Sequence, residues 1–191
     1  MRQRQLTRMG NAANGAGLSL LMAGDQAESA RWFAQAARRW RESYAEAPPG
    51  SWGRTIGSIK ARILAGDRGG AERDAHWTLE EGADRAESPI GQYAACLAHL
   101  VLGHSEPARV LADGLRSHEG FPTDVGDALA FVAADDIVGY TEAIESVLES
   151  FETRTEYLED VPVADTVLVL QALAKQRGID VELESLVLPP A

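Results

Sequence analysis

The sequence contains one cysteine, Cys96, in 191 residues, so the chain cannot form an internal disulfide or a cysteine-based zinc site. Such sparse use of cysteine is typical of reducing compartments, and we expect a cytoplasmic location. No run approaches eighteen consecutive apolar residues, so the sequence predicts no membrane-spanning helix. Arg2, Arg4 and Arg8 before a short apolar stretch imitate a signal peptide only loosely. The stretch continues into a helix-turn-helix pattern that cleavage would divide, so we expect no signal peptide.

The composition is that of an ordinary folded chain. Apolar residues make up 45% and charged residues 25%, far from the low hydrophobicity and high charge of disordered segments. A length of 191 residues suffices for one hydrophobic core, and two independent domains are not required. We therefore predict one continuous domain over residues 1–191.

The formal net charge of −11 is distributed unevenly along the chain. Residues 1–73 contain twelve of the eighteen basic residues but only six of the twenty-nine acidic ones, so residues 74–191 are strongly acidic. This polarity favours a basic protein partner for the C-terminal part and repels nucleic acid from it, because phosphate carries the same sign of charge. The alternative, that the acids only solvate the surface as in salt-adapted proteins, stays open.

Three glycine turns recur along the sequence and predict a helical repeat. Each follows an apolar helix end and precedes a second helical pattern, at residues 21–25, 63–67 and 100–104, spaced by 42 and 37 residues. Glycine at a helix end adopts the left-handed conformation at little cost and redirects the chain. Asp25, Asp67 and Ser105 follow these turns, and we expect each to cap the next helix.

Apolar residues at three- and four-residue intervals define four helix pairs, at about 10–46, 53–83, 89–117 and 122–153. In the fourth pair, Ala134-Asp135-Asp136 replaces the glycine turn. A further helix over 162–177 is apolar almost all round, which indicates a buried capping helix, and residues 179–191 read as an extended tail. The sequence therefore predicts an all-α fold of about nine helices, stacked as antiparallel hairpins in an α-α superhelix whose inner face is the default binding surface.

The first pair carries small and large residues at the positions where helix pairs cross. Gly17, Gly24-Asp25, Ser29, Phe33 and Ala36 occupy these positions, and in this respect the segment resembles the tetratricopeptide repeat (TPR). The second and third pairs keep the small residues Ala71 and Ala108, but the large aromatic position has become Ala75 and Ala112. The resemblance covers about residues 10–150 and implies helix-pair geometry and a protein-binding role.

A second resemblance extends over the whole chain. It is carried by a second block that begins with a tryptophan and by the motifs Leu158-Glu159-Asp160-Val161-Pro162, residues 173–179 and Leu188-Pro189-Pro190. In these features the chain is similar to the bacterial immunity proteins of polymorphic toxin systems, in the family numbered forty-nine. The resemblance implies a cytoplasmic antidote that binds and occludes a cognate toxin.

The candidate catalytic and metal-binding residues form no complete motif. His76 and Glu80 lie four residues apart on one helix, but no second histidine shares that face. Cys96 with His99 could in principle form a nucleophile and base, but Cys96 stands where a helix pair needs a small residue, and packing explains it fully. The glycine-rich segment 66–70 lacks the lysine and hydroxyl of a phosphate-binding loop. We predict no catalytic residue, no metal site and no cofactor.

Charged surfaces remain as candidate binding sites. Arg31, Arg38, Arg39 and Arg41 surround Trp40, and arginine beside an aromatic ring can bind nucleic acid or an acidic partner. We favour the interpretation that Trp40 is core and that the arginines are its solvated flank, paired with Glu42, Glu46 or the acidic C-terminal part. The candidate partner face is the acidic surface of the fourth pair: Asp124, Asp127, Asp135, Asp136, Glu142, Glu145 and Glu149. Simple solubility explains these acids as well.

We therefore expect a non-catalytic module that binds another protein, a basic one if the acidic surface is the contact face, and that binds neither nucleic acid nor membrane. Toxin neutralisation is its sharpest form, and a general TPR-type adaptor or regulatory subunit is the alternative. An all-helical enzyme would instead predict a bound metal or a perturbed titratable pair in a cleft.

Overall fold

The computed structural model describes residues 2–190, and within them all regular secondary structure is helical. The helices are α1 (Arg2–Met22), α2 (Gln26–Tyr44), α3 (Gly53–Leu64), α4 (Arg68–Glu80), α5 (Pro89–Val101), α6 (Ser105–Arg116), α7 (Thr123–Ala133), α8 (Ile137–Glu152) and α9 (Asp165–Lys175), with the 3-10 turns η1 (Ala83–Arg85) and η2 (Leu158–Asp160). Residues 2–190 contain no β-strand. The prediction of an all-α fold with about nine helices is therefore confirmed.

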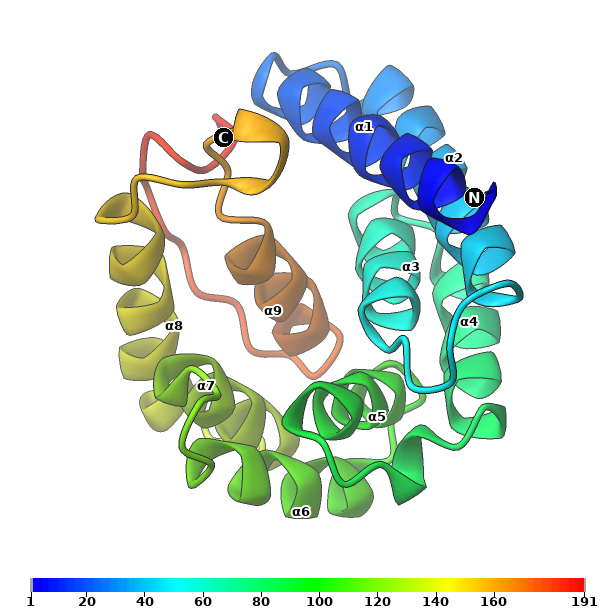
Figure 1. Cartoon of the computed structure of the whole chain (residues 1–191). Helices are drawn as coiled ribbons and strands as arrows, with labels where there is room; N and C mark the ends of the chain where they lie inside the picture. Colours follow the sequence, from blue (N-terminus) through cyan, green and yellow to red (C-terminus); the bar gives the residue numbers. More distant parts are fainter. Residues whose placement is uncertain (1, 191) are drawn as a thin grey trace.

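The helices follow one another in space as they do in sequence. From α1 to α8 each helix packs against the next one along the chain, and α9 packs against α3, α7 and α8. Figure 1 shows α1 to α8 arranged around a ring, with α9 inside it. No helix within residues 2–190 is long and apolar enough to cross a membrane.

One backbone motif recurs at the four turns within the helix pairs. A residue with positive φ ends the first helix, and these residues are Gly24, Gly66, Gly103 and Asp135. At each turn the next backbone N–H donates to the carbonyl five residues back, at 2.9 or 3.0 Å. This is the bonding of a Schellman C-cap. Asp135 occupies the left-handed region in place of glycine, so the turn without glycine has the same geometry as the other three.

Aspartates begin most of the second helices. The carboxylates of Asp25, Asp67 and Asp136 each accept a hydrogen bond from the backbone N–H three residues later, at 2.9 to 3.1 Å. The prediction that Ser105 caps the third pair is wrong. His104 precedes α6 without a side-chain cap bond, and Ser105 is already the first helical residue, so its hydroxyl does not stand at the capping position.

The first helix begins at Arg2, earlier than the range 10–46 expected for the first pair. Its glycines allow close contact with aromatic rings. Trp40 of α2 is wedged between α1 and α3, because a Cβ atom added at Gly10 or Gly57 would lie 2.7 or 2.8 Å from its ring. Gly17 receives the ring of Phe33 in the same way, at 2.8 Å. The interpretation of Trp40 as a core residue is confirmed, since it is 6% exposed.

The last helix and the chain after it complete the core. Val167, Leu170 and Leu173 of α9 are buried, as expected, but α9 lies inside the ring against α3, α7 and α8 and does not cover the end of the helix array (Figure 1). Residues 179–190 form no helix, and Ile179 and Leu188 anchor them to the large core cluster; residue 191 of the predicted tail lies outside the described residues. The backbone N–H of Ala164, just before α9, donates to the carbonyl of Val187 at 2.8 Å.

Candidate functional site: an inner groove between the helix pairs

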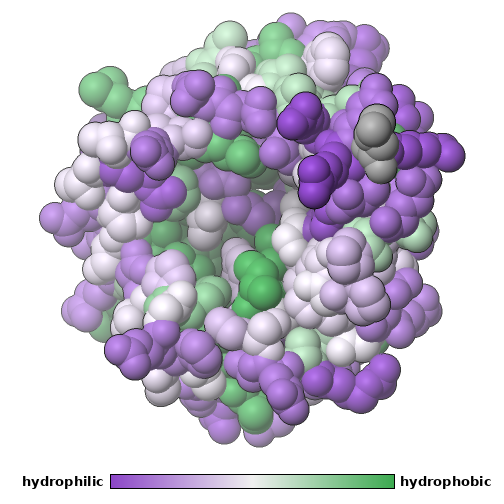
Figure 2. All heavy atoms as spheres, viewed as in Figure 1, coloured by the Kyte–Doolittle hydropathy of each residue, from purple (hydrophilic) through white to green (hydrophobic). Residues whose placement is uncertain are grey.

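Two pockets meet at Ile90, and together they form what we call the inner groove. The larger, of about 470 Å³, lies between α1, α3, the α2–α3 loop, η2 and the start of α9. The smaller, of about 360 Å³, lies between α5, the α6–α7 loop, α7, the end of α8 and α9. Figure 2 shows a hollow on this face, with hydrophobic residues gathered inside it and hydrophilic residues around its rim.

Two of the exposed large apolar side chains belong to this groove. Ile90, at the first turn of α5, is 46% exposed and lines both pockets. Leu158 of η2 is 50% exposed and lines the larger one. Trp52 and Phe121 contribute further apolar surface to the walls. Exposed apolar side chains gathered in a concavity are typical of a binding site.

A partly buried ion pair joins the two pockets at the start of α9. The Lys60 ammonium lies 2.6 Å from the Asp165 carboxylate and donates to the Thr166 hydroxyl at 3.0 Å. Burial by itself lowers the pKa of Lys60, but the charges of Asp165 and Tyr93 and the hydrogen bond to Asp165 outweigh it, so that the pKa is raised. Burial also raises the pKa of Tyr93. Both groups therefore keep their ordinary protonation states near neutral pH.

The groove also contains polar groups with unused bonding capacity. Asn14 of α1 is 5% exposed and lines the larger pocket, and its side chain makes no hydrogen bond to any of residues 2–190. The Asn11 carboxamide oxygen accepts from the Trp40 indole at 3.1 Å, which leaves its NH2 group available. These amide groups reach the pocket, so a bound ligand can form hydrogen bonds with both side chains.

Two arginines of the groove lack a carboxylate partner in the part of the chain that the structure describes. Arg54 donates to the Ser43 hydroxyl at 2.9 Å, and desolvation lowers its pKa. Arg154 lies over the Phe151 ring, 3.5 Å from its centroid, and donates to the Ser150 carbonyl at 3.2 Å. With the Lys60–Asp165 pair neutral overall, these arginines make the groove cationic.

The structure separates the seven acidic candidates into two groups. Asp127 pairs with Arg116 at 2.7 Å, Asp135 pairs with Arg177 at 3.3 Å, and Asp136 caps α8. The others, Asp124, Glu142, Glu145 and Glu149, form no ion pair with residues 2–190, and the three glutamates are exposed on α8. None of the seven lines either pocket of the inner groove. Contact of the unpaired acids with a partner stays a prediction.

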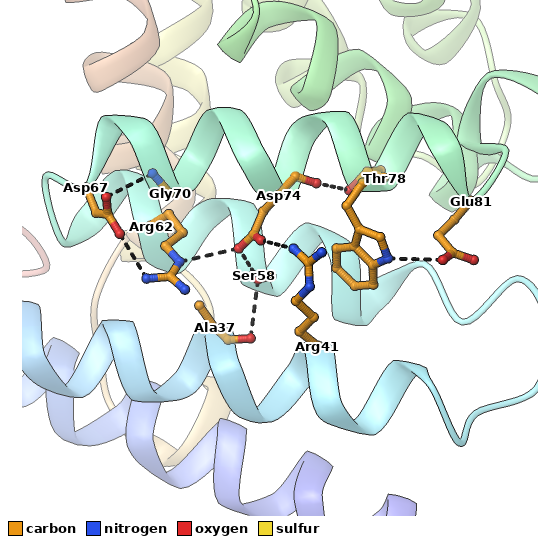
Figure 3. Close-up of polar contacts among 10 residues, drawn as sticks. Ala37, Arg41, Ser58, Arg62, Asp67, Gly70, Asp74, Thr78 and Glu81 are labelled. Atoms are coloured by element: carbon orange, nitrogen blue, oxygen red, sulfur yellow. Dashed lines mark hydrogen bonds and ion pairs between the residues drawn. The ribbon is translucent and has the colours of Figure 1, made fainter.

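The polar network that holds the first two helix pairs together was not among the sequence predictions (Figure 3). Asp74 of α4 is 3% exposed, and its carboxylate accepts from Arg41 of α2 at 2.6 Å, from Ser58 of α3 at 2.6 Å and from Arg62 of α3 at 3.3 Å. Arg62 also bonds to Asp67 at 2.9 Å. Since every partner comes from a neighbouring helix, the network is structural.

Three of the four arginines around Trp40 pair with acids, as predicted. Arg39 pairs with Glu42 at 2.8 Å, as predicted, and Arg31 pairs with Glu28. Arg41 does not use Glu42 or Glu46, because it reaches the buried Asp74.

The structure does not bring the candidate catalytic and metal-binding residues of the sequence together into a site. His76 is exposed on α4, and residues 2–190 contain no cluster of three or more His, Cys, Asp or Glu side chains that could hold a metal ion. Cys96 is fully buried, and burial raises the pKa of its thiol to about 12, which removes its nucleophilic form at neutral pH. The segment 66–70 forms the turn and first residues of α4, with Asp67 as cap.

Comparison with known proteins adds no further assignment. No protein-family model matches the chain, and neither the curated proteins nor the solved structures provide a match.

The sequence contains a pattern that could have identified some of the groove residues. Lys60 and Asn14 interrupt helices whose neighbouring positions are small or apolar, so a polar residue there indicates a buried or cleft-facing position. Asp165 had no such signal, since an acid in the first turn of a helix is ordinary. Its pairing with Lys60 depends on how α9 enters the ring.

Proposed function

We propose that this chain is a non-catalytic helical-repeat protein that binds a segment of another protein along the inner groove. The observation that carries the proposal is the presence in one concavity of exposed apolar side chains, Ile90 and Leu158, together with the unpartnered Asn14 and the arginines. Apolar anchors supply binding energy, and the few polar groups orient the bound segment.

The charge of the groove favours an acidic segment. Arg54 and Arg154 lie in different pockets and lack carboxylate partners among residues 2–190, so a segment with acidic residues on both sides of an apolar anchor would pair with them while covering Ile90. Carboxylates bound to arginine make strong, oriented hydrogen bonds. Asn14 would bond to the backbone of the segment.

Lys60 supports binding over catalysis. A catalytic lysine needs a lowered pKa so that part of it is unprotonated near neutral pH. The Asp165 carboxylate helps to raise the pKa of Lys60, so the ammonium stays protonated and works as a fixed link between α3 and α9.

The acidic face of α8 is a second candidate surface. Glu142, Glu145 and Glu149 are exposed and unpaired within the described chain, so they suit a basic partner. Whether the partner binds in the groove or on α8, the resemblance to immunity proteins favours a specific function, that of an antidote that occludes a toxin. The resemblance to TPR proteins favours a more general function, that of an adaptor. A toxin gene directly upstream of this one would favour the antidote, and rescue of growth on co-expression would test it.

The experiment compares three baits in native lysate at physiological salt and at about 0.5 M salt, where the Debye length is roughly 4 Å. The baits are the wild type, an Ile90→Glu/Arg154→Glu groove variant, and a Glu145→Lys/Glu149→Lys face variant. A photo-crosslinking residue at position 90 then identifies the bound segment.

A partner that the groove variant loses, that the face variant keeps, and whose crosslinked segment is acidic would support the proposal. Loss only from the face variant would move the binding site to α8. Retention by both variants, or no stoichiometric partner at either salt, would refute the proposal.

A further inference from the structure

Two histidine rings face each other at the end of α5 that lies opposite the inner groove. The Nδ1 atoms of His99, in α5, and His104, in the α5–α6 turn, are 3.2 Å apart, and the ring centroids are 5.4 Å apart. His99 is 7% exposed, whereas His104 is exposed to solvent. The turn that brings them together is the repeated one, in which the His104 N–H donates to the His99 carbonyl at 2.9 Å.

A carboxylate on the far side of His99 decides which of its nitrogens carries the proton. Asp84 of η1 lies 2.8 Å from His99 Nε2. A carboxylate accepts hydrogen bonds, so Nε2 of His99 donates and Nδ1 of the neutral ring keeps its lone pair. Without an ion, His104 Nδ1–H donates a hydrogen bond to that lone pair. A carboxylate behind a histidine is also the arrangement that orients metal-binding histidines in proteins.

The separation of the two nitrogens fits a bound ion. Two nitrogens at 2.0–2.1 Å from a tetrahedral Zn²⁺ lie roughly 3.3 Å apart. The observed 3.2 Å is close to that value. An ion replaces the proton shared by the two rings: when His104 carries its proton on Nε2, the Nδ1 lone pairs of both histidines are free to bind it. We propose that His99 and His104 bind a single Zn²⁺ ion, with Asp84 as the positioning residue for His99 and water in the remaining coordination positions.

Water is part of this proposal, because residues 2–190 offer no third His, Cys, Asp or Glu ligand at the site. The exposure of His104 leaves room for it. Cys96, one turn away on α5, is not a ligand, because its Sγ is buried and directed to the Ala108 carbonyl. An ion held by two imidazoles joins η1 to α5 and α6. It stabilises the folded chain in proportion to its free concentration.

The test is a Zn²⁺ titration of the purified full-length chain, by calorimetry in a non-coordinating buffer, with His104→Ala and Asp84→Asn beside the wild type. The His104 side chain is exposed and makes no cap bond, so we expect His104→Ala to keep the fold. We expect one ion per wild-type chain, at least a tenfold weaker affinity in His104→Ala, and about a tenfold loss in Asp84→Asn, the lower end of the usual effect of such carboxylates. Mg²⁺, which prefers oxygen ligands, is expected not to compete.

The other two histidines provide matched controls. His76→Ala and His118→Ala keep the affinity, and in NMR spectra of the imidazole protons only the His99 and His104 signals move with added Zn²⁺. Absence of saturable binding up to about 1 mM Zn²⁺ would overturn the proposal. So would binding that survives in His104→Ala or disappears in His76→Ala. The groove lies at the other end of α5, so neither result depends on whether the groove binds a protein.

Discussion

Replacement of Asp74 by alanine tests whether one buried carboxylate holds the first two helix pairs together. Asp74 is 3% exposed, and its two oxygens accept hydrogen bonds from Arg41, Ser58 and Arg62. A hydrogen bond to a charged group is worth about 1.5–3 kcal/mol, and loss of one member of a buried pair costs about 3–5 kcal/mol.

The structure places the expected cost near the lower end of that range. The Arg41 side chain is 46% exposed and can be rehydrated, and Arg62 keeps its bond to Asp67. We therefore expect Asp74→Ala to lower the free energy of unfolding by about 3 kcal/mol. For a chain of this size, that corresponds to a fall in Tm of about 6–12 °C.

The assay is urea unfolding followed by tryptophan fluorescence, with Tm from circular dichroism. Glu72→Ala on the same helix is the matched control, because its pair with Arg68 is exposed and is worth less than about 0.5 kcal/mol. Asp74→Asn removes the charge and keeps the shape, and we expect a smaller loss than for alanine. If Asp74→Ala costs no more than Glu72→Ala, the network does not hold the pairs together and the reasoning fails.

Two further predictions concern packing and pH. Gly57→Ala places a methyl group 2.8 Å from the Trp40 ring, which Gly10 also confines, so we expect the free energy of unfolding in urea to fall by about 1–3 kcal/mol. The control is Gly114→Ala, where nothing lies within 4 Å and the change should be neutral or stabilising. Equal effects of the two substitutions would contradict the tight packing of Trp40 between Gly10 and Gly57. Burial raises the pKa of the Cys96 thiol to about 12 in the folded chain, whereas the ordinary pKa of an exposed thiol is 9.0. Between these two pH values the unfolded chain therefore binds fewer protons than the folded chain. The free energy of unfolding falls as pH rises above 9. Urea midpoints at pH 7, 9 and 10.5 measure this fall, which Cys96→Ala should reduce; a flat profile, or rapid reaction of the folded thiol with a thiol reagent at pH 8, would contradict it.

Local features of the sequence were sufficient to predict the helices and most of their turns. Glycine before aspartate at 24–25 and 66–67 predicted both the stop and the cap, since each depends on residues within one turn of the chain. The failure at Ser105 has the same local origin, because α6 begins one residue too early for that hydroxyl to cap it.

Contacts between helices distant in sequence were not predictable in this way. Asp74 occupies the same helix face as Ala71 and Ala75, so a buried acid was inferable there, but its partners come from two other helices. The facing rings of His99 and His104 depend on the left-handed turn at Gly103, and their link to Asp84 depends on η1.

By itself, the sequence determined the fold class, the order of the helices and the polarity of charge, because periodicity, capping and composition are local or additive properties. Only the tertiary structure decided which charges meet. It placed Lys60 against Asp165, more than a hundred residues away, left Arg54 and Arg154 without carboxylate partners among residues 2–190, and made a cationic groove inside an acidic protein. Net charge is a sum over the whole chain, whereas the charge of a groove depends on which few side chains the packing of helices brings to one surface.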